Sequence, residues 1–235
     1  MKIKPIKTRV FNENEKLLPF ILKYVKEIPE KSIFVITSKI VSLAEGRTVE
    51  YKNEKQKTAL IKKESSFSLK TKLTWLTIKD GMVMAAAGID ESNANGKIIL
   101  LPKDCFKTAE YIRRELQKKF KIKKLGVLIT DSRIFPLRAG VVGVALGYAG
   151  FKGIRNYIGE KDIFGKKLKM SRTDVADSLA TSAVLCMGEG KEQQPLSLIN
   201  NAPVIFTDKI NKKELVINFK EDMFYPLFKN IKNGK

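Results

Sequence analysis

The sequence predicts an α+β protein. Short apolar runs of strand length, such as residues 32–37 and 126–130, occur beside longer segments whose apolar residues recur at helical spacing. The dipeptide Asp80-Gly81 lies between two further apolar runs, which indicates a β-hairpin because these residues accept the backbone of a tight turn. Hydrophobic residues make up 43% of the 235 residues, which is enough to fill a core. One large domain or two small ones are therefore expected.

Local patterns predict the elements of the N-terminal half. A helix is expected from about Glu15, where Pro19 is tolerated because the first turn does not need its missing N–H group. A second, lysine-rich helix is expected over residues 52–64, and a short one ends at Gly46. The expected extended segments are residues 1–11, 32–37, 73–78 and 82–87.

Ser38 and Lys39 follow the strand at 32–37 directly and precede a short helix. A strand–turn–helix of this kind can present backbone N–H groups to an anion. Taken alone, a helix cap by Ser38 is the simpler interpretation.

In the C-terminal half, helices are expected over residues 108–120 and 172–187, the second opened by Ser171 and Asp174 in a spacing like a capping box. Further strands are expected at 204–206 and 215–219. Between the two helices lies a series of glycines at positions 140, 143, 147, 150 and 153. Their spacing is that of a close-packed helix face, but loops that approach a ligand also need glycine, so the spacing does not decide.

Composition excludes several kinds of chemistry. Histidine is absent, which excludes a histidine base, a Ser-His-Asp triad and any histidine metal ligand. The two cysteines, Cys105 and Cys186, are far apart and are expected to be reduced core thiols, so a zinc site is not expected. The chain shows no signal peptide and no apolar run long enough to cross a membrane, which predicts a cytoplasmic protein.

The net charge of +20 makes nucleic-acid binding the first interpretation. However, most basic residues are lysines spread along the chain, and Trp75, the sole tryptophan, lies in an alternating strand rather than among arginines. Nucleic acid is therefore an alternative rather than the expected partner. Arg138 and Arg155 fall in the glycine-rich stretch and are expected to face an anionic substrate, with a surface salt bridge as the alternative.

Three places leave a strand or helix with acidic or hydroxyl groups. They are Asp90 with Asn93, Asp131 with Ser132, and Glu189 between two glycines. Each alone is a weak signal, because an aspartate after a strand is usually a turn former. A carboxylate at the end of a helix is unfavourable unless a cation is bound nearby. Together these hard oxygen ligands suit Mg²⁺ or Mn²⁺, and they indicate a metal-dependent enzyme.

Six longer segments give a more specific signal when they are taken together. The segments are residues 36–47, 87–94, 126–132, 140–147, 157–165 and 187–190. Together they resemble the coenzyme F-420:L-glutamate ligase family, CofE. The resemblance covers nearly the whole chain in the order of the family, which makes it much more specific than any single motif.

The resemblance implies a fold of two interleaved subdomains with mixed sheets, residues 1–90 with 173–235 and residues 91–172. It also implies a GTP-driven γ-glutamyl transfer from L-glutamate onto an anionic acceptor, the deazaflavin precursor of coenzyme F-420, with two divalent metals and a homodimer. Asp90 and Asp131 would hold one metal, and Ser132 with Glu189 the other. The residues that would contact the nucleotide are Thr8, Arg9, Val10, Phe11, Ser38, Lys39, Asn93, Met187, Gly188, Gly190, Lys191, Glu192, Gln193 and Gln194.

The chain departs from the family near the nucleotide. Leu43 stands where some members have lysine, and residues 7–11 lack a Gly-Leu-Pro pattern, so ATP is the alternative to GTP. A folate-like acceptor is the alternative substrate, and an inactive homologue is a further alternative. The residues themselves fit the reaction, because activating a carboxylate as an acyl phosphate requires metals and arginines but neither histidine nor a reactive thiol.

Overall fold

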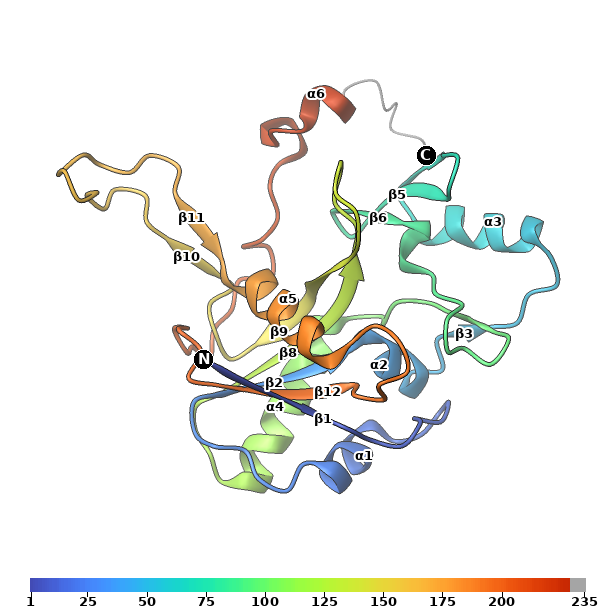
Figure 1. The fold of residues 1–235 in the computed structure, drawn as a ribbon, viewed down its shortest axis with the longest axis horizontal. Helices are drawn as coiled ribbons and strands as arrows, with labels where there is room; N and C mark the ends of the chain where they lie inside the picture. The colour runs from blue at the N-terminus through green and yellow to red at the C-terminus, as the bar shows by residue number, and fades with distance from the viewer. Residues whose placement is uncertain (229–235) are drawn as a thin grey trace.

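The computed structural model of the protein describes residues 1–228, and a five-stranded mixed sheet forms its centre (Figure 1). The strands of this sheet are, in spatial order, β1 (Lys2–Ile6), β12 (Leu196–Asn200), β2 (Ser32–Thr37), β8 (Leu125–Arg133) and β9 (Val142–Ala149). Only β2 and β8 run parallel to each other, and the other neighbours are antiparallel.

Helices cover both faces of this sheet, because the side chains of its central strands are apolar on both faces. Phe34 and Ile36 of β2 belong to the core under α1 (Leu17–Tyr24), α2 (Ser38–Ala44) and α4 (Cys105–Phe120). Ile33 and Val35 point the other way, toward α5 (Val175–Met187). A strand buried on both faces reads as a continuous apolar run, which explains the pattern of residues 32–37.

Smaller sheets surround the central one. A three-stranded antiparallel sheet joins β4 (Phe67–Lys70), β5 (Trp75–Lys79) and β6 (Met82–Ala85), beside α3 (Glu54–Glu64). Two strand pairs complete the list, β3 (Thr48–Val49) with β7 (Ile98–Ile99) and β10 (Ile154–Asn156) with β11 (Arg172–Asp174). The chain between β10 and β11 forms an arm that projects from the body (Figure 1), and α6 (Tyr225–Phe228) follows near the end of the described chain.

The predicted α+β class is confirmed, and most predicted elements are present. The hairpin turns at Asp80 and Gly81, which have φ angles of 51° and 78°, as a two-residue turn requires. The helix predicted from residue 108 begins earlier, at Cys105, because the Asp104 side chain accepts a hydrogen bond from the Lys107 N–H group at 2.8 Å and caps it. The proposed division into two subdomains stays a prediction.

The start of the helix predicted over 172–187 was misplaced. Residues 172–174 form β11, and α5 begins at Val175 with Asp174 as its N-cap, which accepts from the Asp177 N–H group at 2.9 Å. Ser171 therefore does not cap this helix. A three-residue strand pairing with β10 takes the place of the expected first turn.

The glycine series does not form a helix face. Gly143 and Gly147 lie on strand β9, and a Cβ atom at either would come within 2.5 Å of the Ala180 carbonyl oxygen or 2.6 Å of the Cys105 backbone. Glycine at these two positions therefore lets α5 and α4 approach opposite sides of one strand. The close-packing interpretation holds, but the helical one is wrong.

The strands predicted at 204–206 and 215–219 are also wrong. Residues 204–206 form only an isolated bridge between Phe206 and Phe151, and 215–219 has no strand at all. Val204 and Leu215 pack against the core beside α5 instead, so burial rather than strand pairing explains their apolar character. Cys105 is buried as expected, but Cys186 is exposed on α5 and is not a core residue.

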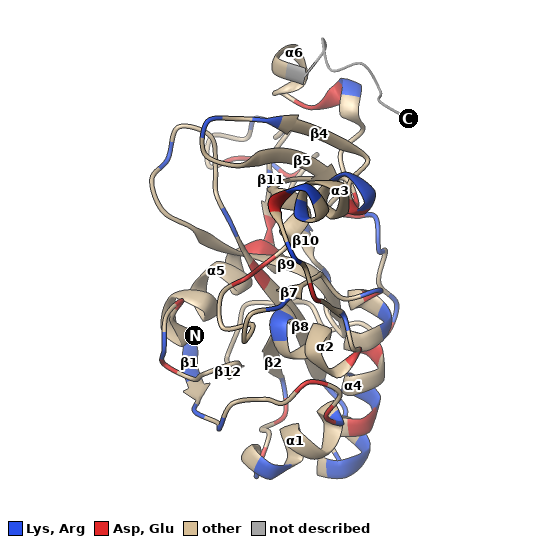
Figure 2. Ribbon diagram, turned by 90° about the vertical axis from the view of Figure 1, so that its right-hand side faces the viewer, with Lys and Arg blue, Asp and Glu red and all other residues tan. Residues whose placement is uncertain are grey.

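Charge is distributed over the whole molecule rather than gathered on one face. Lys and Arg occur on α3 at one end of the molecule and on α1 and α4 at the other (Figure 2). Within residues 1–228, no helix combines the length and the apolar character that crossing a bilayer requires.

Candidate functional site

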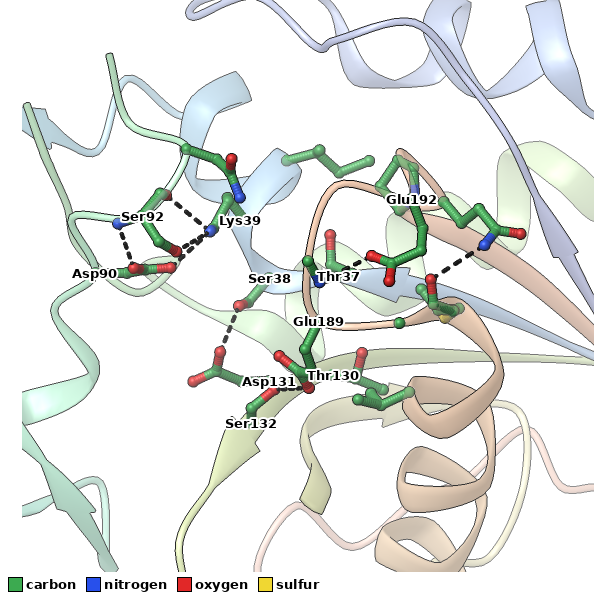
Figure 3. A pocket seen from close by; sticks show the side chains of 18 of the residues that line it. Thr37, Ser38, Lys39, Asp90, Ser92, Thr130, Asp131, Ser132, Glu189 and Glu192 are labelled. Carbon is green, nitrogen blue, oxygen red and sulfur yellow. Dashed lines mark hydrogen bonds and ion pairs between the residues drawn. The ribbon is translucent and has the colours of Figure 1, made fainter. Parts of the chain in front are cut away.

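One cavity of about 550 Å³ opens at the ends of β2 and β8 (Figure 3). These two strands are parallel, and their pairing ends with Thr37 opposite Thr130. The residues that come next in each segment, Ser38 and Asp131, therefore lie close together at the same edge of the sheet. Sequence patterns separated by more than 90 residues converge here because of this strand pairing.

Every residue expected to contact a nucleotide or a metal lines this cavity. The segment Thr8–Phe11 and the loop after α5 form neighbouring parts of the wall, because the Thr8 N–H group donates to the Gln193 carbonyl at 2.9 Å. The lining residues expected from the sequence are Thr8, Arg9, Val10, Phe11, Ser38, Lys39, Asp90, Asn93, Asp131, Ser132, Met187, Gly188, Glu189, Gly190, Lys191, Glu192, Gln193 and Gln194.

Asp90 lies on the wall beyond β6 and is held by Lys39. The Lys39 ammonium is 2.7 Å from the Asp90 carboxylate and also donates to the Ser92 carbonyl at 2.9 Å. Burial raises the pKa of Asp90, but the hydrogen bond and charge of Lys39, with the Ser92 N–H group, outweigh it and hold the pKa below its usual value. Asp90 is thus an ionised carboxylate paired with the ammonium group of Lys39.

Asp131 and Ser132 lie at the end of β8, and alternation along the strand sends their side chains to opposite faces. The Ser38 hydroxyl donates to Asp131 Oδ1 at 3.3 Å, and Arg133 forms an ion pair with Asp131 Oδ2. On the other face the Ser132 hydroxyl donates to Glu189 Oε1 at 2.5 Å (Figure 3). Ser38 is the first residue of α2 and makes no capping bond, so its interpretation as a helix cap is wrong.

The loop after α5 closes on itself around Glu192. Gly188 ends the helix with a φ angle of 84°, which a side chain would oppose, and the Gly190 N–H group donates to the Glu192 carboxylate at 2.8 Å. The Gln194 side chain donates to the Met187 carbonyl at 3.3 Å. The loop therefore keeps its shape through its own hydrogen bonds and leaves Glu189 exposed in the cavity wall.

Arg9 lies in the cavity wall but is already engaged. Its guanidinium pairs with Glu15 and lies 5.1 Å from the centre of the Phe20 ring. Arg138 and Arg155, expected to face an anionic substrate, are not among the lining residues. Arg138 belongs to the loop joining β8 and β9, and Arg155 lies over Tyr157 beside a smaller hollow. Their role stays a prediction.

Sequence reasoning missed Arg133 as a site residue. It is the last residue of β8, only 7% exposed, and lines the cavity beside Asp131. In the sequence it reads as a polar residue entering a turn. Its one available signal was its position on the same face of the strand as Asp131, two residues away.

The oxygen donors of the cavity fit a divalent metal by type, because Mg²⁺ and Mn²⁺ take carboxylate and hydroxyl oxygens. They do not form a finished cluster: among residues 1–228, no three acidic, cysteine or histidine side chains are gathered closely enough to hold a metal ion. Asp90 and Asp131 are instead paired with Lys39 and Arg133. The oxygen donors therefore fit a divalent metal by type, but two of them, Asp90 and Asp131, are already paired with basic side chains of the protein.

Comparison with known proteins places this chain in one group. Residues 5–201 match the family described as F420-0:γ-glutamyl ligase. A protein of Methanococcus maripaludis strain C7 named coenzyme F420:L-glutamate ligase is 36% identical over 231 residues, covering 91% of this chain and 92% of that one. A relative of the same name from Methanosarcina acetivorans is 31% identical over 225 residues, or 88% of this chain and 87% of its own length. A third, from Methanococcus maripaludis strain S2, is 44% identical over 146 residues, which span 62% of this chain and 58% of the relative.

Proposed function

This chain belongs to the F420-0:γ-glutamyl ligase family and is an amide-forming ligase, and from that premise we propose its substrates. It joins the amine of L-glutamate to a carboxylate of the deazaflavin precursor F420-0, and it uses GTP to activate that carboxylate as an acyl phosphate. The nucleotide and the reacting groups meet in the cavity at the ends of β2 and β8.

The observation that carries this proposal is the convergence of distant segments on one cavity. Five parts of the chain line the same space: residues 8–11, 38–39, 90 with 92–93, 131–132 and 187–194. Its volume of about 550 Å³ lies within the range of small-molecule sites. A structural role for each polar segment alone would not require them to share a cavity.

The residues of the cavity divide the work by their chemistry. Lys39 is a flexible point charge that can exchange Asp90 for a phosphate oxygen of the nucleotide. The loop 188–195 and the segment 8–11 supply backbone groups and a wall that excludes water from the activated carboxylate. The high positive charge of the chain favours the approach of its anionic substrates.

Divalent metal ions complete the proposal. Asp90 and Asp131 would hold one ion, and Ser132 with Glu189 a second. When bound, such ions neutralise charge on the transferring phosphoryl group and orient it. Two donors are already close, since the Ser132 hydroxyl and Glu189 are 2.5 Å apart.

A homodimer is part of the same proposal. The arm between β10 and β11 exposes large apolar side chains, including Ile163 at 92% and Phe164 at 89%. Exposed apolar side chains gathered on a projecting arm favour contact with another protein surface. Sedimentation velocity measures the assembly directly, and a monomer at micromolar concentration contradicts this part.

The experiment that tests the function is a reaction with ¹⁴C-labelled glutamate, Mn²⁺ and either GTP or ATP. The acceptors are F420-0 and a folate, each run with and without nucleotide. We expect labelled product and released GDP only with F420-0 and GTP, because amide formation requires the activated acceptor. Omission of the acceptor is the control, since nucleotide hydrolysis without acceptor would not reflect ligation.

Each alternative gives a different result in this experiment. Product formed only with the folate would identify a folate as the acceptor in place of F420-0. Product formed only with ATP would identify ATP as the nucleotide in place of GTP. Mn²⁺ and nucleotide binding without product from either acceptor contradicts the proposed substrates and indicates an inactive homologue.

A further inference from the structure

Arg133 is a buried arginine whose donors are mostly unused. Its Nη1 atom forms the ion pair with Asp131 and donates to the Ser132 carbonyl at 2.9 Å. Its Nε and Nη2 atoms are buried and have no hydrogen-bond partner among residues 1–228. A buried donor without an acceptor is costly, and native proteins rarely leave two on one side chain.

Arg133 forms its ion pair with a single carboxylate within the described residues. Asp131 is the carboxylate that contacts it within the described residues. Asp177 on α5 is engaged elsewhere, because it accepts from the Ala145 N–H group at 2.8 Å. Burial raises the pKa of Asp177, and the hydrogen bond from the Ala145 N–H group, the side chain of Asp174 and the charge of Arg133 act to lower it. Arg133 thus lies at the cavity wall with two nitrogens, Nε and Nη2, whose N–H groups could donate to an anion.

A metal ion at Asp131 and the ion pair of Asp131 with Arg133 exclude each other in part. Asp131 Oδ2 is held by Arg133, and Oδ1 accepts from Ser38. A cation that coordinates this carboxylate meets a positive charge already bound to it. Lys39 holds Asp90 in the same manner, so both acids of the proposed first metal site are paired.

We propose that Arg133 is an exchangeable counterion: it leaves Asp131 when the divalent ion binds, and its freed guanidinium then holds the phosphoryl group that is transferred. The two unpartnered nitrogens are the donors that the phosphoryl oxygens would satisfy, in the planar fork that suits phosphate. This inference rests on the proposed function, because it takes Asp131 as a metal ligand and a nucleotide as the phosphoryl donor.

The first test measures Mn²⁺ binding alone, by calorimetry, in wild type and in Arg133→Gln. Removing the competing cation should tighten Mn²⁺ binding, by about tenfold or more, since a unit charge this close acts strongly on a divalent ion. Arg133→Lys keeps the charge and should bind Mn²⁺ more weakly than the glutamine variant. A purely structural role for Arg133 predicts unchanged or weaker Mn²⁺ binding in Arg133→Gln, and that result would overturn the exchange.

The second test uses nucleotides with Mn²⁺ present but without glutamate or acceptor, so that ligation cannot occur. Arg133→Gln should lose about tenfold in affinity for GTP and little for GDP, because only GTP carries the phosphoryl group to be transferred. Equal losses for both nucleotides would show that Arg133 does not hold that group.

Arg113→Gln is the matched control. Arg113 is buried to a similar degree, 5% exposed, but it contacts the Leu125 carbonyl and is not a lining residue. Its Mn²⁺ affinity should equal that of wild type. If Arg133→Gln does not fold, the ¹⁵Nε resonance of Arg133 in the wild-type protein decides instead: addition of Mg²⁺ should shift it, and an unmoved resonance at saturating Mg²⁺ contradicts the exchange.

The proposed function and the inference on Arg133 can be contradicted independently of each other. Wild-type protein that binds neither Mn²⁺ nor GTP contradicts the proposed function itself. Wild-type protein that binds both, with an Arg133→Gln variant that behaves identically, leaves the function standing and removes only this inference.

Discussion

A buried arginine lies at each end of strand β8, Arg113 of α4 at the first residue and Arg133 at the last, and the two differ in how many of their donors have partners. At the first residue, Leu125, the carbonyl accepts from Arg113 Nε at 2.8 Å. The other nitrogens of Arg113 lie 2.5 Å from Asp208 and 3.6 Å from Glu110, so each of its three nitrogens has a partner. At the last residue, Arg133 has one ion pair and two nitrogens without partners among residues 1–228.

This difference indicates a structural role for the arginine at the first end of β8 and a ligand-binding role for the arginine at the other end. A saturated buried arginine fixes the packing of α4 against β8 and has nothing left to offer a ligand. An unsaturated one is a cost to the folded protein that a ligand can recover. The cavity accordingly lies at the second end, and four predictions test how far the division holds.

The largest effect is expected for Asp131→Asn. A neutral amide binds divalent ions far more weakly than a carboxylate, so kcat/KM should fall by about 1,000-fold, equivalent to several kcal/mol of metal-derived stabilisation. Calorimetry with Mn²⁺ should show the same loss, while circular dichroism reports an intact fold. Unchanged Mn²⁺ affinity would remove Asp131 from the metal site.

Gly150→Ala should break the structural end instead. A Cβ atom at Gly150 would lie 2.1 Å from the Leu125 carbonyl oxygen and 2.5 Å from Arg113 Nε, and the residue has a φ angle of 86°. Overpacking and left-handed strain together should cost about 3 kcal/mol of unfolding free energy, measured with urea. The Mn²⁺ affinity of the folded protein should not change. A lower Mn²⁺ affinity in a variant that is still folded would contradict the separation of the structural end of β8 from the end at the cavity.

Glu189→Gln should act only when ligands are present. The glutamine oxygen can still accept from Ser132, and an acid at the end of α5 opposes the helix dipole by about 0.3–1 kcal/mol, so the variant without ligands should be as stable or slightly more stable. At ligand concentrations near 100 times Kd, the wild type should gain about 2.7 kcal/mol from Mn²⁺ and nucleotide. Thermal melts measure both, and a variant that keeps the full ligand-induced shift makes Glu189 structural.

The smallest effect is expected at the start of α5. Burial, with the nearby charge of Asp177, raises the pKa of Asp174 to about 6. Because this folded value lies above the unfolded value of about 4, the group stabilises the protein fully below pH 4, and that contribution is lost as the pH rises through 6. Asp174→Asn should still cap the helix but remove this slope, leaving a stability near pH 7 that is equal or higher by up to about 1 kcal/mol. Urea titrations at pH 4.5 and 7 measure the unfolding free energy of wild type and Asp174→Asn. If the variant keeps the full pH dependence of stability, that dependence comes from groups other than Asp174.

Sequence reasoning captured what depends on local order and on family resemblance. The α+β class and the ligase family are confirmed, and the strand that carries Asp131 lies where the apolar run at residues 126–130 predicted it. The apolar pattern of residues 215–219 predicted a strand that the structure does not contain. Only Leu215 of this segment packs against the core, while Val216, Ile217 and Phe219 are exposed, so an apolar run does not by itself establish burial or strand pairing.

Arg133 was missed for a related reason. Its identity as a site residue depends on its burial and on its missing partners, and both are properties of the assembled cavity. Arg138, five residues further on, has the same chemistry in the sequence but lies in an exposed loop. A single sequence cannot distinguish these two arginines, because only the strand boundary between them sets which one faces the cavity.

The pairing of β1 with β12 also sets when the cavity can exist. Lys2 lies opposite Asn200, so β1 is synthesised almost 200 residues before its partner strand β12. At ribosomal rates of about 5–20 residues per second this delay is about 10–40 s. During that time the segment at Thr8–Phe11 has no Gln193 carbonyl to bind, and the unpaired edge of β2 is open to other strands. The nascent chain therefore depends on late, long-range closure, and ligand binding can help it only after synthesis has passed residue 200.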